Sequence, residues 1–151
     1  MPQANLNWIL LLPILAGVAV AIQTALNGQL RVLVNSPLIA ALLSFMIGTL
    51  ALVLLVIFTK QQMPGLSHLS GTDWYKFVGG LLGAFFIVVM IVSVQRMSVA
   101  NLLALVVAGQ LITALILDHF GLLGAKQSSI TLTRALGAIA LIIGTYLINK
   151  K

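Results

Sequence analysis

Polar side chains that could bind a ligand stand inside long apolar runs of this chain. Gln23 and Asn27 interrupt the charge-free run 1–30, and Asn101 and Gln110 interrupt a second charge-free run, 97–117, which Asp118 follows. Carboxamides can hold a small molecule by hydrogen bonds without fixing its charge, whereas a carboxylate in a membrane can handle a proton or a cation. A carboxamide without a partner in hydrocarbon is costly, so each of these groups must meet another helix, another subunit, water or a substrate.

The spacing of these amides suggests which surfaces they share. Gln23 and Asn27 are four residues apart, which places them on one face of a helix. Asn101 and Gln110 fall on opposite sides of theirs, so that helix needs polar neighbours on two sides, as a central helix of a bundle would. We expect Gln23 and Asn27, with Asn101 or Gln110, to line a substrate-binding cavity. The alternative is that the amides only tie helices together.

Asp118 permits two interpretations. One is an interfacial carboxylate paired with His119, Lys126 or Arg134; the other is an ion-coupling group that handles a proton or cation. The chain contains no cysteine and no glutamate, and its acidic residues are Asp73 and Asp118. We therefore expect neither a metal site nor a cofactor.

The composition indicates the elements that must position these groups. Of 151 residues, 61% are hydrophobic and 7% are charged, whereas soluble domains are about 25% charged. This predicts an all-α, polytopic membrane helix bundle. The net charge of +6 is spread singly along the chain, which does not favour a nucleic-acid partner and instead suggests anchors near lipid headgroups.

Apolar runs and helix-start signals predict five transmembrane helices in a single domain, 1–151. The expected spans are 7–29, 37–59, 74–95, 98–118 and 131–149. Ser36 and Ser98 are predicted N-caps, with Pro37 in the first helical turn, and Thr72 or Asp73 is expected to cap the third span. No Lys or Arg precedes the first apolar run, so we interpret it as a retained helix and not as a cleaved signal peptide.

The last span carries a seam of small residues. Gly137, Ala140 and Gly144 line up along one side of the helix, which suits close approach of a second helix. We expect this seam to form a dimer interface.

The basic residues do not favour one orientation in the membrane. Five spans would place Lys60, Lys76, Lys126 and Arg134 on one side and Arg31, Arg96, Lys150 and Lys151 on the other. Orientation normally follows an excess of Lys and Arg on the cytoplasmic side. Either another factor decides the orientation, or both orientations are inserted and combine as an antiparallel dimer, which would supply the inverted repeats that transporters commonly use.

Three segments resemble a known family. The sequences GVAVAIQTALNGQLR, NSPLIAALLSFMIGTLAL and VAGQLITALILDHFGLLG are similar to the YdcZ-type family of half-size proteins in the drug/metabolite transporter superfamily. The resemblance covers nearly the whole chain. It implies a five-helix, transporter-like protein of a bacterial cytoplasmic membrane, in a family whose members occur singly, as gene pairs or as fused ten-helix forms.

The last helix, with Gly137 and Gly144, also resembles the glycine-containing helix through which small multidrug resistance proteins dimerise. Those transporters exchange protons for cations through a glutamate in their first helix. This chain offers only Gln23 and Asn27 there, so that mechanism is not supported.

The expected function is a half-size transporter subunit that moves small metabolites or drugs by alternating access. Its partner would be a second copy in an antiparallel homodimer, or an oppositely oriented paralogue. The alternative is a non-transporting assembly subunit that partners another membrane protein. An enzyme is not expected, because no Ser/His, paired-Asp or HExxH arrangement is present.

Overall fold

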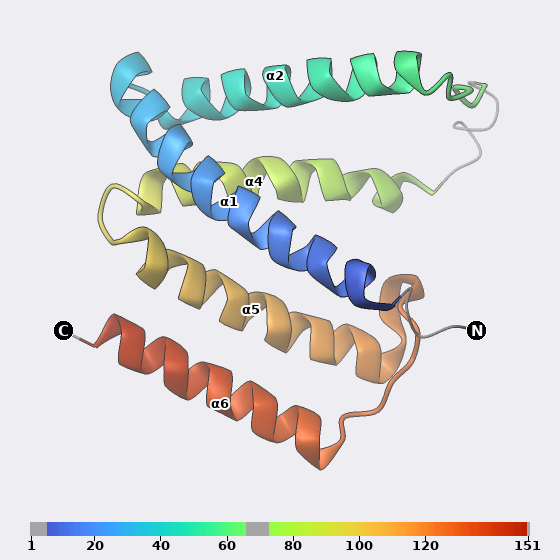
Figure 1. The fold of residues 1–151 in the computed structure, drawn as a ribbon, viewed down its shortest axis with the longest axis vertical. Coiled ribbons are helices and arrows are strands. Elements are labelled where there is room, and N and C mark those ends of the chain that lie inside the picture. Colours follow the sequence, from blue (N-terminus) through green and yellow to red (C-terminus); the bar gives the residue numbers. More distant parts are fainter. Residues whose placement is uncertain (1–5, 66–72, 151) are drawn as a thin grey trace. The chain divides into compact units, whose positions relative to one another are not determined.

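The computed structural model describes residues 6–65 and 73–150. Within these ranges the long helices are α1 (Leu6–Val34), α2 (Pro37–Phe58), α4 (Val78–Ser93), α5 (Val99–Phe120) and α6 (Leu132–Asn149), with short 3-10 helices η2 (Trp74–Phe77) and η3 (Leu122–Gly124) (Figure 1). Counting η2 with α4, five helices are long and apolar enough to cross a membrane. The predicted all-α fold with five transmembrane helices is confirmed.

Two of the predicted helix caps form as expected. The Ser36 hydroxyl accepts a hydrogen bond from the backbone N–H of Ile39 at 3.3 Å, and Pro37 opens α2. The Ser98 hydroxyl accepts one from the N–H of Asn101 at 3.2 Å, at the start of α5. These side chains satisfy backbone donors that the first turn of a helix leaves unpaired.

Of the two caps predicted for the third span, the structure describes only Asp73. Asp73 precedes η2 but does not cap it with its side chain. Its carboxylate instead forms an exposed ion pair with the Lys76 ammonium at 3.1 Å. Thr72, the other predicted cap, lies outside the described residues.

The chain divides into two compact units, residues 1–96 and 97–151, and each is described by itself. In unit 1, helices α1, α2 and α4 pack against one another. A small core lies where α1 ends, α2 begins and α4 ends, formed by Ala40, Ala41, Ile87 and Ile91, with Leu30, Val34 and Val88 around it. The two alanines allow the helices to approach closely there, because a methyl side chain takes little room.

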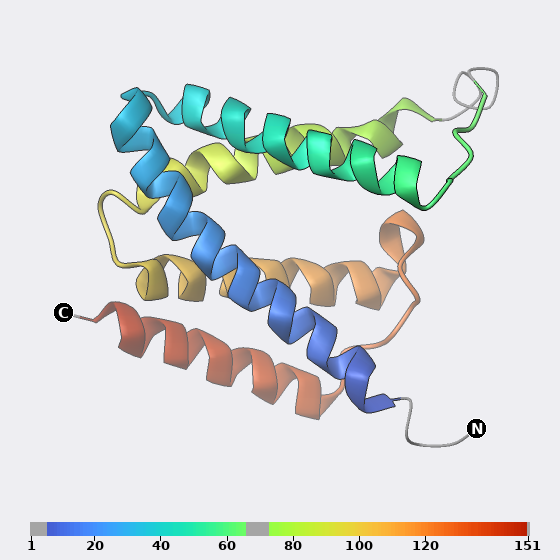
Figure 2. The ribbon, with the colours of Figure 1, turned by 45° about the horizontal axis from the view of Figure 1, so that its top comes forward.

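Unit 2 is an antiparallel hairpin of α5 and α6, which lie side by side in both views (Figures 1 and 2). The Thr145 hydroxyl donates a hydrogen bond to the Ala104 carbonyl at 3.2 Å, and the Asn149 amide donates one to the Asn101 carbonyl at 3.4 Å. Bonds between a polar side chain and a neighbouring backbone are a common link between helices in lipid. The expectation that both units belong to one domain stays a prediction.

Candidate functional site

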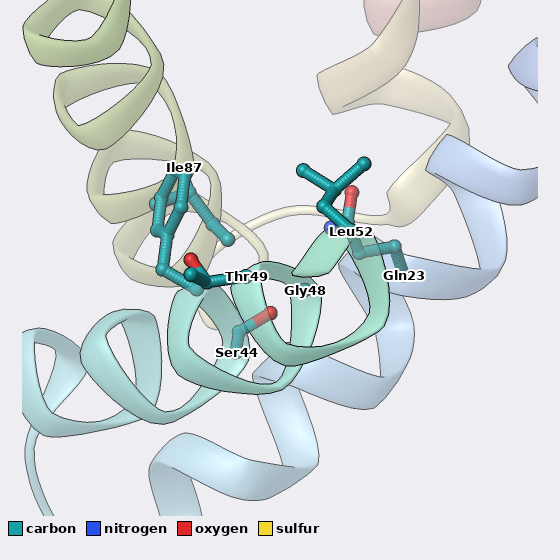
Figure 3. Close-up of a pocket in the computed structure, with 7 residues that line it drawn as sticks. Gln23, Ser44, Gly48, Thr49, Leu52 and Ile87 are labelled. Atoms are coloured by element: carbon teal, nitrogen blue, oxygen red, sulfur yellow. The ribbon is translucent and has the colours of Figure 1, made fainter. Parts of the chain in front are cut away.

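Unit 1 contains an open pocket of about 220 Å³ between its three long helices. Its lining residues are Gln23 from α1, Ser44, Phe45, Gly48, Thr49 and Leu52 from α2, and Ile87 from α4 (Figure 3). We call it the Gln23 pocket. In this pocket a predicted substrate-binding residue, Gln23, is accompanied by other polar side chains.

The polar side of the pocket combines one amide with two hydroxyls. Ser44 and Gly48 are four residues apart on α2 and share a face, with Thr49 beside them. Gly48 leaves this face open, since a Cβ added there meets nothing within 4 Å. The amide of Gln23 and the hydroxyls of Ser44 and Thr49 each donate and accept hydrogen bonds. The site can therefore orient a small ligand that carries matching polar groups.

The remaining wall of the pocket is apolar. Phe45, Leu52 and Ile87 contribute it, and none of the seven lining side chains is ionisable. Ile87 is buried, while Leu52 keeps 65% of its surface exposed. An apolar wall with a few convergent polar groups is the usual make-up of a small-molecule site.

The structure separates the two amides of the first helix. Gln23 is exposed and lines the pocket, whereas Asn27 is 7% exposed and is not among the lining residues. Between them, buried Thr24 donates its hydroxyl hydrogen to the Val20 carbonyl at 2.8 Å. That hydroxyl serves the helix itself, which is how membrane helices commonly satisfy a buried threonine.

A contact between α1 and α4 did not emerge from the sequence. The Gln95 side chain donates a hydrogen bond from Nε2 to the Gly28 carbonyl at 3.0 Å. Gly28 is buried, and a Cβ added there would lie 2.9 Å from Val94 Cγ1. The absence of a side chain at residue 28 is therefore what lets the end of α4 reach α1. Gly28 alone does not indicate in the sequence that Gln95 is its partner.

The amides of the fourth span lie in unit 2. Asn101 is half-buried near the start of α5, and its carbonyl accepts the Asn149 bond. Gln110 is exposed on the same helix. Their expected part in a substrate cavity with Gln23 stays a prediction.

Asp118 pairs with Arg134, one of the three partners suggested by the sequence. Its carboxylate lies 2.6 Å from the guanidinium, and the two side chains are 33% and 35% exposed. The same arginine donates to the carbonyl and the hydroxyl of Ser128 at 3.0 and 2.9 Å. The N–H of Ser128 donates to the Asp118 carbonyl at 2.8 Å. Asp118 therefore helps to shape the connection between α5 and α6.

The imidazole of His119 serves the same connection. Its Nδ1 accepts a hydrogen bond from the N–H of Ile130 at 3.3 Å. Gly121 ends α5 with φ of 63°, a left-handed conformation that glycine adopts without the steric cost of a Cβ. Asp118 and His119 thus both stabilise the connection between α5 and α6 in unit 2.

The predicted dimer seam lies on α6, where its two glycines leave space for an added Cβ. Gly137 and Ala140 are exposed and Gly144 is half-buried. A Cβ added at either glycine meets nothing within 4 Å. Gly137 also borders an open groove of about 480 Å³ along α5 and α6, together with Arg134. The interface itself stays a prediction.

Comparison with known proteins identifies the family. The model of the family described as "Putative inner membrane exporter, YdcZ" matches residues 8–147. Inner membrane protein YdcZ of Escherichia coli (strain K12) is 32% identical over 139 residues, which covers 91% of this chain and 92% of that protein. No solved structure matches. With its five membrane-spanning helices, this chain belongs to the YdcZ family of inner membrane proteins.

Proposed function

We propose that this chain is one half of a transporter that moves small metabolites or drugs across the bacterial inner membrane by alternating access. The family is described as an exporter family, which supports transport as the general activity. The observation that carries the proposal is the Gln23 pocket, an amide and two hydroxyls facing apolar side chains between three membrane-spanning helices.

The proposed working unit is an antiparallel homodimer. Transporters are commonly built from two inverted halves around a site near the middle of the membrane, and one chain supplies five spans. A second copy inserted in the opposite orientation supplies the other half. The balance of four basic residues against four supports insertion in both orientations.

Transport is tested with purified protein in liposomes, using radiolabelled amino acids and sugars and a set of fluorescent drugs of positive, negative and zero charge. For a compound that the native chain moves, Gln23→Leu should lower the initial rate about tenfold, because loss of one hydrogen bond to the substrate is worth roughly 1.4 kcal/mol. The matched control is Gln29→Leu, since Gln29 is an exposed glutamine of the same helix outside the pocket.

Asn27→Leu extends the test to the second amide of α1. If Gln23→Leu and Asn27→Leu both left transport intact in a folded protein, the assignment of a cavity to this helix would be wrong. If no compound moved faster than through empty liposomes, the alternative of a non-transporting assembly subunit would take precedence.

The dimer is tested separately, through the orientation of the chain in cells. Each terminus is fused in turn to green fluorescent protein, which is active in the cytoplasm, and to alkaline phosphatase, which is active in the periplasm. Signal from both reporters at each terminus would support the antiparallel homodimer. Signal from only one reporter at each terminus would overturn the antiparallel homodimer. It would instead favour pairing with an oppositely oriented paralogue.

A further inference from the structure

We infer that the Gln23 pocket selects an uncharged amphiphile, a small molecule with a hydroxyl or carboxamide at one end and an apolar body. The inference rests on the proposed function and names the class of substrate. It follows from the charge, the hydrogen-bonding groups, the size and the surroundings of the pocket.

The pocket offers no counter-ion. None of its seven lining residues is ionisable. Asp73, the only acidic residue of the 96 in unit 1, already pairs with Lys76 at 3.1 Å at the start of η2. An ion that leaves water for such a site loses its hydration and gains no opposite charge in return. A cation or anion is therefore disfavoured against a neutral molecule of the same shape.

The polar groups of the pocket complement a group that both donates and accepts. A carboxamide offers two N–H donors and one acceptor oxygen, and a hydroxyl offers one donor and two lone pairs. Gln23 on α1 and Ser44 and Thr49 on α2 (Figure 3) thus supply donors and acceptors of the kinds that a ligand hydroxyl or amide needs. Phe45, Leu52 and Ile87 are left to contact an apolar body.

The size and the rim of the pocket fit the same class. Its volume of about 220 Å³ lies below the range of about 300–1,000 Å³ that is usual for drug-sized ligands. A single ring or a short chain therefore fits better than a large polycyclic drug. Two lining side chains remain open at the rim, Leu52 at 65% and Phe45 at 42% exposure, so the pocket borders the apolar surroundings in which a neutral amphiphile dissolves.

Three probes that share a phenyl ring and a short chain, and carry a neutral, a cationic or an anionic head group, test this inference. They are 2-phenylethanol, 2-phenylethylammonium and phenylacetate, each radiolabelled and equilibrated with the full chain in lipid nanodiscs, with empty nanodiscs subtracted. We expect saturable binding of 2-phenylethanol at least tenfold tighter than that of either ion. Gln23→Leu should weaken the binding of 2-phenylethanol about tenfold, and Gln29→Leu should leave it unchanged.

Two results would overturn the inference while the proposed function stands. One is binding of the ammonium or the carboxylate that equals or exceeds binding of the alcohol. The other is transport in liposomes of a charged compound, in a manner that Gln23→Leu abolishes. Absence of saturable binding of 2-phenylethanol, or binding that is indifferent to Gln23→Leu, would also overturn it. The liposome assay then decides independently whether the chain transports at all.

Discussion

The Gln95 amide donates a hydrogen bond to the backbone carbonyl of Gly28 across 3.0 Å, and so ties the turn after α4 to α1. Val94 packs at the same place, 2.9 Å from where a Cβ of residue 28 would lie. Gly28 is followed along α1 by Leu30 and Val34, which contact the core of unit 1. The contact thus belongs to the region that sets how α1 approaches the other helices of the pocket.

Replacement of Gly28 by alanine should destabilise the protein. The added methyl group would meet the β-branched side chain of Val94, which has little freedom to turn away. Overpacking of this kind costs about 1–3 kcal/mol, and it exceeds the gain of about 1 kcal/mol in helix propensity. The measurement is equilibrium unfolding of the purified protein in mixed detergent micelles.

Gly17→Ala provides the matched control in the same helix. A Cβ added at Gly17 meets nothing within 4 Å, so this variant should unfold at the native midpoint or slightly above it. Equal midpoints for the two alanine variants would show that the close contact at Gly28 does not constrain the fold.

Gln95→Leu should have a smaller effect than Gly28→Ala. Hydrogen bonds between helices in a membrane contribute about 0.6 kcal/mol on average, and the Gly28 carbonyl lies inside α1, where the helix offers it a backbone donor. The same unfolding measurement should therefore show a loss below about 1 kcal/mol. If Gln95→Leu lost as much free energy of unfolding as Gly28→Ala, Gln95 would have to stabilise unit 1 through contacts beyond this one hydrogen bond.

The sequence predicted local features well and distant contacts poorly. The caps at Ser36 and Ser98 follow from the nearest few residues, and both form. Gln95 and Gly28 are 67 residues apart, and nothing near either residue specifies the other. The predicted cap at Asp73 did not form, because its carboxylate pairs with Lys76 instead.

Helical periodicity also described the candidate site only in part. A spacing of four predicts a common face for Gln23 and Asn27, but it does not predict which helix passes over each residue. In the structure Asn27 is buried and Gln23 opens into the hollow beside α2. In the sequence, Ser44 and Thr49 stand within the charge-free run 38–58, with nothing nearby that marks them as ligand-binding. Their meeting with Gln23 depends on the packing of α1 on α2.

The ion pair between Asp118 and Arg134 should contribute measurable stability. A double-mutant cycle with Asp118→Asn and Arg134→Gln should give a coupling of about 1 kcal/mol, near the upper end for partly exposed pairs. The comparison pair is Asp73 and Lys76, whose side chains are 59% and 56% exposed. Its coupling should be about 0.5 kcal/mol or less, because water screens it more strongly. Equal coupling energies for the two pairs would contradict the claim that the Asp118–Arg134 pair contributes more stability than an exposed ion pair.

Asp118→Asn also separates the two interpretations of this carboxylate. If its role is to hold the connection between α5 and α6, the variant should unfold more easily and transport each compound at the native rate per folded molecule. The measurement is uptake into liposomes with and without an imposed proton gradient. If the native chain responds to the proton gradient and Asp118→Asn does not, the result would instead favour ion coupling by Asp118.

If the proposed dimer forms through the α6 seam, Gly137→Leu should weaken its association without unfolding the chain. A Cβ at residue 137 meets nothing within 4 Å in the single chain, and the rest of the larger side chain can enter the open groove that Gly137 borders. Across a close helix pair it would hold the backbones apart and remove the packing that drives helix association in lipid. We expect at least a tenfold weaker association, measured by energy transfer between donor-labelled and acceptor-labelled copies in liposomes, with an unchanged unfolding midpoint.

Gly109→Leu is the control for that experiment, because Gly109 is an exposed glycine of α5 that also has nothing within 4 Å of an added Cβ. It lies outside the seam formed by Gly137, Ala140 and Gly144, so its association should match that of the native chain. Equal energy transfer for native protein and Gly137→Leu would reject the seam as the dimer interface. A loss shared by both leucine variants would show that association depends on the general shape of unit 2 and not on the α6 seam.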